Sequence, residues 1–599
     1  MITPHRVDKA LHLRPKLFLV FFCLYILILL ALERFGLDEL SLEYLLLAPL
    51  LILYIGTGLS SGPVNRSRFF VAGHVVSAPL SGLAAAACWL SPLFFFGAAG
   101  ALFMGGLQGF AFIGGLAGGF IIIALLIAPY LRKSGDLTLP SFFANRFGGN
   151  TIRILSSIIL ISSLLLYLIA QFYAFGFLSS RYLNLDLKTA IYLGAAAALA
   201  PCVFGGMRSV INVQSIQYIV IALALALPVT IFSIQFAEIP VPQLSYGTAL
   251  TDLAELEQRW TSSPLVELPK SMVNFESSSF ARFFSLTLTL ILGTASFAHL
   301  LMHFTTSPNE KDSQKSVSWA LFFVVVIASL VPAYVFFTKL EFYQHVIGSK
   351  IDELPSWIYL IGSHGLIDIC GSAASSVDAL WLACKDIEGN TGVVRPQDIS
   401  VNSSAILLIL PLIANTSKVI PLLLLAGLLT AAISTANSLL ITISNCICED
   451  IGRKTLLHRL PTHSQILLSR IFLVGTALFA TWACFNLPAN PLDLVLWAFS
   501  LAAAGFFAPL VLSIWWKSCT RTGALGGMAV GFIWSLGYIL SAHFDVLPVW
   551  PSIDGTTVAL ASVPLSFAIT TILSLLTTSS ARTTQPFLDT IPVTGKDHK

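Results

Sequence analysis

Long runs of apolar residues, separated by short polar stretches, recur from one end of the chain to the other. Each run is close to the roughly 20 residues that a helix needs to cross a bilayer. The pattern therefore predicts an all-α polytopic membrane protein with about 14 transmembrane helices. The weakest separations lie at 104–107 and 206–211, where the apolar signal hardly breaks. The predicted segments are 17–33, 43–60, 77–104, 107–131, 151–179, 189–206, 211–236, 284–304, 317–339, 418–447, 464–485, 493–516, 522–543 and 556–577.

Basic residues gather in alternate loops, and this alternation predicts the orientation. Short loops rich in Lys and Arg face the cytoplasm. With the N-terminus inside, the basic loops fall inside and the acidic loops outside, except for the loop with Arg181 and Lys188. We expect both termini to be cytoplasmic in a plasma membrane, such as a bacterial inner membrane. The basic loops carry Arg66 and Arg68; Arg132, Lys133, Arg146 and Arg153; Arg208; Lys311 and Lys315; Arg453, Lys454 and Arg459; and Lys517 and Arg521.

The first apolar run has a competing interpretation as a signal peptide, because a basic start precedes it. It is long for a signal core, and no small-residue cleavage site comes before Glu33 and Arg34. We therefore expect a retained helix within an N-terminal segment, residues 1–76. At the other end, the polar residues 578–599 predict a short cytoplasmic tail.

Composition agrees with a membrane protein and excludes several other classes. The 599 residues are 56% hydrophobic and 11% charged, whereas a soluble protein carries about a quarter charged residues. A net charge of +3 is too small to predict nucleic-acid binding. No stretch fits a soluble catalytic domain, so we expect no enzyme. The nine cysteines have no metal-site spacing.

Two long polar stretches, 237–283 and 340–417, are predicted to lie outside as loops with short helices. The second contains Cys370 and Cys384. An oxidising compartment would permit a disulfide between them, but the sequence leaves that question open.

Transporters often contain two inverted sets of helices with broken helices in equivalent places. Segment 77–104 contains Gly82 and Pro92, and segment 284–304 has small polar residues in its middle. Taking these as first helices predicts two five-helix sets, 77–236 and 284–516, followed by C-terminal helices in 517–577.

Ser434 and Thr435 are adjacent hydroxyl residues within the apolar segment 418–447. In one interpretation they bond back to carbonyls of their own helix and allow close packing. In the other, the two hydroxyls and a free carbonyl form half of a sodium site, because oxygen ligands suit a small hard cation.

Several motifs, in this order along the chain, resemble the sodium:solute symporter family, and most closely its bacterial cation/acetate symporter branch. The likeness covers roughly residues 45–577. The motifs include Phe70-Val71-Ala72-Gly73-His74, Ala128-Pro129-Tyr130-Leu131, Leu139-Pro140-Ser141-Phe142, Ala170-Gln171-Phe172-Tyr173, Gly205-Gly206-Met207-Arg208, Gly293-Thr294-Ala295 and Trp515-Trp516-Lys517.

The resemblance implies a five-plus-five inverted-repeat fold with a sodium site between its first and eighth core helices. Ser434 and Thr435 would supply side-chain oxygens, while Ala87, Leu90 and Ala431 would supply carbonyls. The sequence is compatible with this, because Pro92 has no N–H and leaves the carbonyl of Cys88 without its helical partner. Unwound backbone is tolerated in a membrane where it lines a site.

The chain departs from the family pattern around the expected substrate cavity. An acid is usual at Cys88, and small residues are usual at Pro92 to Phe94. Gln171 and His299 lie at mid-membrane positions; Gln171 is predicted either to shape the site or to bond between helices, and His299 to contact an anion or carry a proton. The candidate substrate-binding residues are Cys88, Phe94, Gln171 and His299.

The sequence therefore predicts a sodium-coupled symporter of a small organic solute, with sodium as co-transported ion. The resemblance implies a short monocarboxylate, such as acetate or pyruvate. The alternative is a sensor or partner-bound module that keeps the transporter fold with little transport. An intramembrane enzyme is a third class, for which the sequence contains no supporting motif.

Overall fold

The structure is a computed structural model that describes residues 9–59, 65–261, 277–385, 392–403, 405–456, 461–487, 489–546 and 553–577. The predicted tail, 578–599, lies outside the described residues. The first helices are α1 (Lys9–Arg34), α2 (Glu39–Leu59), α3 (Arg66–Val71), α4 (Ala78–Trp89), α5 (Pro92–Gly105), α6 (Phe110–Ile122), α7 (Ala128–Ser134), α8 (Leu139–Phe147), α9 (Asn150–Tyr182), α10 (Leu187–Ala237) and α11 (Pro242–Thr261).

The second half of the chain is also mainly helical. Its helices are α12 (Ser277–Ser296), α13 (Ala298–Phe304), α14 (Glu310–Ala328), α15 (Leu330–His345), α16 (Ser356–Ser363), α17 (Val377–Lys385), α18 (Ala405–Ile413), α19 (Val419–Cys446), α20 (Thr462–Asn486), α21 (Pro491–Ala502), α22 (Ala508–Trp515), α23 (Arg521–His543) and α24 (Ala559–Leu576). Three π-helical stretches, Ile123–Ile127, Ile447–Leu456 and Ala503–Phe507, continue or join these helices.

Among the described residues, 11 helices are long and apolar enough to cross a membrane, or up to 13 if each bent pair counts as one span. Two of them are long enough for two crossings: Pro92–Ser134 has 43 residues and Leu187–Ala237 has 51. Each of these two covers, in whole or in part, two of the segments predicted from the sequence. The count of 14 stays a prediction, as does the division into two five-helix sets.

The long helix α10 bends where the sequence signal was weakest. Gly206 has φ 60° and ψ −150° inside it, a conformation that essentially only glycine adopts. A Cβ at this position would lie 2.6 Å from the carbonyl oxygen of Phe69. Gly206 therefore serves both the bend in α10 and its close contact with α3.

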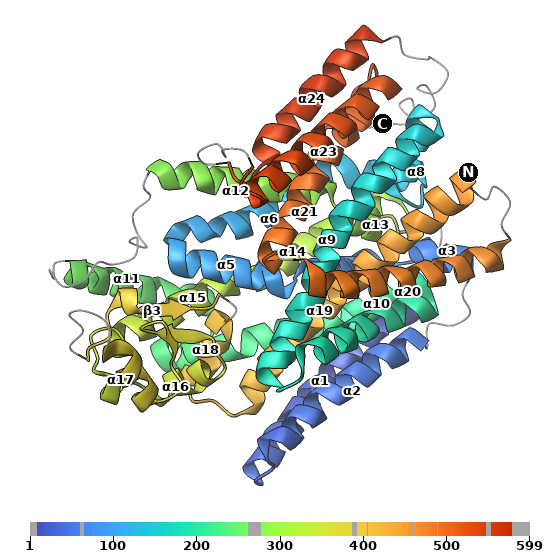
Figure 1. Ribbon diagram of the computed structural model, residues 1–599. Coiled ribbons are helices and arrows are strands. Elements are labelled where there is room, and N and C mark those ends of the chain that lie inside the picture. The colour runs from blue at the N-terminus through green and yellow to red at the C-terminus, as the bar shows by residue number, and fades with distance from the viewer. Residues whose placement is uncertain are drawn as a thin grey trace, which may run out of the picture.

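Helix α19 lies in the middle of the molecule (Figure 1). In its most apolar window 94% of residues are buried, and it packs against α4, α9, α10 and α20. Helices α23 and α24 lie side by side at one end, and α1 and α2 lie at the other (Figure 1). The central position of α19 places Ser434 and Thr435 in the core.

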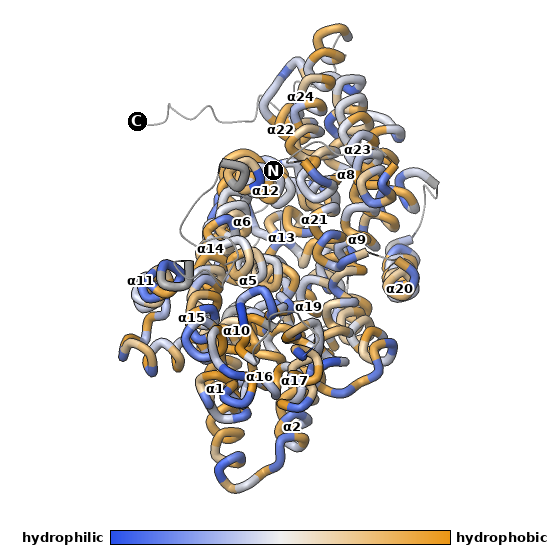
Figure 2. The backbone as a smooth tube through the Cα atoms, turned by 60° about the vertical axis from the view of Figure 1, so that its left-hand side comes forward, coloured by the Kyte–Doolittle hydropathy of each residue, from blue (hydrophilic) through white to orange (hydrophobic). Residues whose placement is uncertain are grey.

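The outer helices consist largely of apolar residues, coloured orange in Figure 2, and many of these residues are exposed. Phe21 of α1 is 66% exposed, Ile52 of α2 is 69% exposed and Leu575 of α24 is 70% exposed. In water, such apolar surface would be costly, whereas lipid chains cover it at no such cost. The exposed apolar helices agree with an integral membrane protein.

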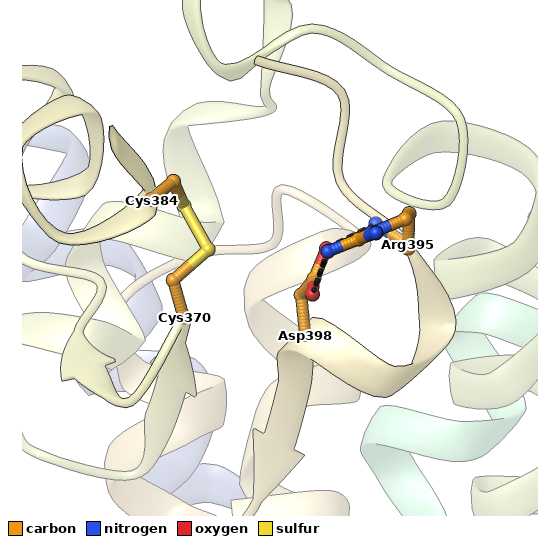
Figure 3. Close-up of a disulfide and its surroundings, with 4 residues drawn as sticks. All are labelled: Cys370, Cys384, Arg395 and Asp398. Atoms are coloured by element: carbon orange, nitrogen blue, oxygen red, sulfur yellow. Dashed lines mark hydrogen bonds and ion pairs between the residues drawn. A yellow bond between two sulfur atoms is a disulfide. The ribbon is translucent and has the colours of Figure 1, made fainter. Parts of the chain in front are cut away.

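The expectation of an all-α protein is wrong at one place, because residues 346–403 include a small three-stranded sheet. The strands β1 (Ile367–Ile369), β2 (Ser372–Ala373) and β3 (Ile399–Val401) are antiparallel, in the order β2-β1-β3. Cys370 and Cys384 form a disulfide beside this sheet, and Arg395 pairs with Asp398 at 3.0 Å (Figure 3). The structure thus answers the disulfide question, in a region predicted to face an oxidising compartment.

Candidate functional site

The segment predicted as the first core helix is interrupted in its middle. Helix α4 ends at Trp89 and α5 begins at Pro92, and the backbone is not helical at Leu90 and Ser91. The Ser91 hydroxyl accepts from the Phe94 N–H at 3.2 Å and caps α5. The break is therefore at the place that Pro92 predicts.

This break leaves backbone carbonyls without their usual partners. The Ser91 N–H, which a continuous helix would give to Ala87, donates instead to the carbonyl of Trp89 at 2.8 Å. Pro92 has no N–H for the carbonyl of Cys88. Because Ala87 and Leu90 are fully buried, their carbonyls lie away from water. Such carbonyls can act as cation ligands.

The two hydroxyls on α19 differ in their hydrogen bonds. Thr435 Oγ1 donates to the carbonyl of Ala431 at 3.1 Å, which is the bond that the packing interpretation predicts. Ser434 Oγ has no hydrogen-bond partner among the described residues, although Ser434 is fully buried. A buried polar atom without a partner costs about 1–3 kcal/mol, so the unpartnered Ser434 hydroxyl is the atom that a bound cation would satisfy.

The predicted ligands therefore come from two elements that touch, because α4 packs against α19. All five residues are fully buried: Ala87, Leu90, Ala431, Ser434 and Thr435. The group offers three carbonyls and two hydroxyls, all neutral oxygens. That donor set fits a monovalent hard cation better than a transition metal, which prefers nitrogen or sulfur ligands. Among the described residues, no cluster of His, Cys, Asp and Glu could hold such a metal.

A second polar group lies one turn further along α19. The side-chain amide of Gln214, on α10, donates to the Ser434 carbonyl at 2.8 Å and to Ser438 Oγ at 2.7 Å. His303, on α13, bonds the same hydroxyl through Nε2 at 2.8 Å. Three helices, α10, α13 and α19, thus meet at the Ser438 hydroxyl.

A small cavity lies on the α5 side of the break. Its volume is about 20 Å³, which is room for about one water molecule. Ser91 and the aromatic residues Trp89, Phe94, Tyr167 and Phe499 line much of it. The cavity is too small for an organic solute in this conformation.

A larger cleft of about 580 Å³ lies next to this cavity and shares Phe112, Leu492 and Leu496 with it. Arg282 and Ser403 line the cleft, and both belong to the stretches predicted to lie outside. The shared apolar side chains therefore separate a cleft on the predicted outer side from the small cavity.

The structure brings some of the predicted substrate residues together and separates one of them. Phe94 lines the small cavity. Gln171 and His299 are fully buried, and neither side chain has a hydrogen-bond partner among the described residues. The ring of His299 lies 5.8 Å from that of Tyr167, one turn before Gln171 on α9. Cys88 is fully buried and is not among the residues that line the cavity.

Sequence reasoning missed Ser91 and Tyr167 as cavity residues. A serine directly before a proline is a typical helix start, so Ser91 could have been found as the cap of α5. Tyr167 lies one turn from Gln171, and that spacing places both on the same face of α9. Only the fold shows that this face borders the break.

Comparison with known proteins decides the family. The sequence profile of the Sodium:solute symporter family matches residues 69–353 and 382–531, which is most of the chain. The chain belongs to the sodium:solute symporter family. This protein is therefore an integral membrane symporter, and sodium is its co-transported ion.

Individual relatives and one solved structure agree with that membership. An uncharacterised symporter of Cupriavidus necator is 29% identical, over 92% of this chain and 93% of its own. A monocarboxylic acid transporter of Corynebacterium glutamicum is 24% identical, over 82% of this chain and 81% of its own. The fold is similar to that of a Na⁺-coupled sialic acid symporter in a substrate-bound outward-open state, with a TM-score of 0.62 and 14% identity over 89% of this chain and 97% of that one.

Proposed function

We propose that this sodium:solute symporter carries a short monocarboxylate, with acetate and pyruvate as the first candidates. The observation that carries the ion half of the proposal is the unpartnered hydroxyl of Ser434 on α19, which packs against the broken end of α4. The aromatic lining of the small cavity, which would limit the length of a solute once the cavity opens, supports the solute half. The similarity to a monocarboxylic acid transporter also supports it.

In the proposed mechanism, sodium binds to the oxygens of Ala87, Leu90, Ala431, Ser434 and Thr435. Binding joins α4 to α19 and favours one conformation of the transporter. The solute enters from the cleft when Phe112, Leu492 and Leu496 move apart. Coupling requires only that both ligands favour the same conformation.

The proposed solute site adjoins the break. Ser91 and Tyr167 are among the residues that line the small cavity, and Gln171 and His299 are buried with unused hydrogen-bonding atoms. A carboxylate can accept hydrogen bonds from all of these groups. Phe94 and Phe499 leave little room for an alkyl chain, which favours a solute of two or three carbons.

Sodium supplies the driving force. Moving one charge across a membrane potential of 100 mV yields about 2.3 kcal/mol. If one sodium ion accompanies each solute anion, the pair carries no net charge, so the sodium concentration gradient drives uptake. A second sodium ion would add the electrical term.

The experiment that tests the proposal is uptake into proteoliposomes with an imposed inward sodium gradient. Labelled acetate, pyruvate and several amino acids would be compared, with choline replacing sodium as the control. We expect sodium-dependent uptake of acetate or pyruvate. Sodium-driven uptake of an amino acid alone would contradict the monocarboxylate assignment.

The alternative is a sensor or partner-bound module that keeps the fold with little transport. The closed cavity of about 20 Å³, with an aromatic ring where the family usually has small residues, is the observation that favours it. Binding of a monocarboxylate to the purified protein without uptake under any sodium gradient would support this alternative over transport.

A further inference from the structure

We propose that Gln214 is a positioning residue of the sodium site, and that its amide sets the sodium affinity from behind the ligands through a network with Ser438 and His303. The inference rests on the proposed function, because it takes Ser434 as a sodium ligand. It adds a residue that acts through the hydrogen bonds of its amide nitrogen to Ser434 and Ser438.

The first step is the contact that Gln214 makes with the ligand residue itself. Its amide nitrogen donates to the carbonyl of Ser434 at 2.8 Å. The bond holds the backbone of Ser434 and leaves the hydroxyl without a partner. This bond fixes the position of the Ser434 hydroxyl and leaves that oxygen free to bind an ion. Hydrogen-bond partners of ligand residues tune metal sites in the same way.

The second step is that the same amide belongs to a network that reaches α4. Gln214 also donates to Ser438 Oγ at 2.7 Å, and the backbone carbonyl of His303, whose ring bonds the same hydroxyl, accepts from Ser81 Oγ of α4 at 3.2 Å. Through Ser438 and His303, the network therefore joins the ligand-bearing turn of α19 to α4, the helix that carries Ala87.

The third step is the location of the network. Gln214, Ser438 and His303 are all buried, with at most 1% exposure, and they come from α10, α19 and α13. His303 Nε2 bonds the Ser438 hydroxyl at 2.8 Å. Hydrogen bonds that lie away from water are strong and hard to replace. The network can therefore hold the ligand-bearing turn of α19 at a fixed distance from α4 before sodium arrives, which lowers the cost of binding.

If the network is broken, sodium itself must order the ligand-bearing turns when it binds, and its affinity falls. We expect Gln214→Met, which keeps the length of the side chain and removes its donors, to raise the half-saturating sodium concentration about tenfold. That change corresponds to about 1.4 kcal/mol of binding free energy. Ser438→Ala should have a similar effect, and the double variant should be little worse than either, because both changes break one network.

The test measures the melting temperature of the full-length purified protein against sodium concentration, with choline keeping ionic strength constant. A ligand that binds only the folded protein raises its melting temperature with concentration. The half-saturation of that rise reports sodium affinity without any solute. Uptake with saturating sodium then measures the solute half-saturation, which we expect to stay unchanged, whereas a purely structural defect would alter both.

The matched control is Ser444→Ala, because Ser444 is buried on the same helix α19 and bonds α20 through the Ser469 carbonyl at 2.6 Å. It removes an interhelical bond ten residues from Ser434 and should leave sodium half-saturation at the wild-type value.

The outcomes separate this inference from the proposed function. If the wild type shows no sodium-dependent rise, the proposed ion site fails. If the wild type responds and both Gln214→Met and Ser438→Ala keep its half-saturation, the positioning role is overturned. If Gln214→Met does not fold, the result with Ser438→Ala alone decides.

Discussion

The hydroxyls of Ser434 and Thr435 are adjacent in the sequence but differ in their hydrogen bonding, and the proposed ion site depends on this difference. Thr435 bonds back to Ala431, as many membrane hydroxyls do, and Ser434 does not. Ser434 has a neighbour, Gln214, that uses its carbonyl and leaves its hydroxyl unused. At the scale of the residue, the proposed ion site is therefore a set of buried oxygens whose hydrogen-bonding capacity is incompletely used.

Phe94 is the residue whose size we expect to set the solute's length. Phe94→Leu should enlarge the small cavity and raise uptake of four- to six-carbon monocarboxylates relative to acetate. Each methylene that a pocket accepts or rejects changes the transition-state binding energy by about 1–3 kcal/mol. The ratio of longer-chain uptake to acetate uptake should therefore change about tenfold or more. Competition against labelled acetate in proteoliposomes measures it.

The control for this change is Phe95→Leu. Phe95 is adjacent and fully buried but does not line the cavity. The Phe95→Leu variant should be less stable than the wild type, but its ratio of longer-chain uptake to acetate uptake should be unchanged. An unchanged ratio for Phe94→Leu would show that Phe94 does not limit solute length.

At this scale the sequence predicted more about backbone than about side chains. Pro92 predicted the break that the structure shows, and the adjacent hydroxyls drew attention to Ser434 and Thr435. Ala87 and Leu90 came from the family resemblance, and their role as ligands stays a prediction. That Cys88 does not line the cavity could not be predicted. It depends on the rotation of α4 about its axis, and nearly every side of α4 is buried.

Breaks and bends in the helices are the features that matter at the scale of the element. The interruption between α4 and α5 frees carbonyls, and the bend of 51° between α12 and α13 at Phe297 brings His299 beside Tyr167. The sequence predicted both from proline, glycine and small polar residues. It did not predict β1 to β3, because strands of two or three residues are too short for an alternating pattern.

Gly206 gives the sharpest test at this scale. Gly206→Ala should destabilise the protein, because alanine strains at φ 60° and its Cβ would lie 2.6 Å from the Phe69 carbonyl oxygen. Such backbone strain costs about 1–3 kcal/mol, and the clash adds to it. We expect a lower melting temperature in detergent.

Gly114→Ala is the matched control for that change. Gly114 lies within helix α6, and a Cβ there would meet no atom within 4 Å. Alanine is the better helix former, so the melting temperature should stay or rise. A Gly206→Ala variant as stable as Gly114→Ala would show that the bend tolerates a side chain.

At the scale of the whole molecule, the structure joins a buried ion site, a closed cavity and an open cleft. The cavity of about 20 Å³ and the cleft of about 580 Å³ are separated by shared apolar side chains. Transport would require this separation to open on one side at a time. The sequence predicted the membrane class and the family from apolar runs and motif order. It could not predict the cavity sizes, because they depend on how aromatic side chains from four helices pack.

The most direct measurement of the central claim is sodium-driven uptake by the Ser434→Ala, Thr435→Ala double variant, using the solute that the wild type accepts. Because Ser434 Oγ has no partner to lose and Thr435 Oγ1 loses only a bond within its own helix, we expect a small change in the melting temperature without sodium. We also expect sodium-dependent uptake to fall to the level measured in choline. A double variant that folds and keeps wild-type sodium-driven uptake would contradict the account.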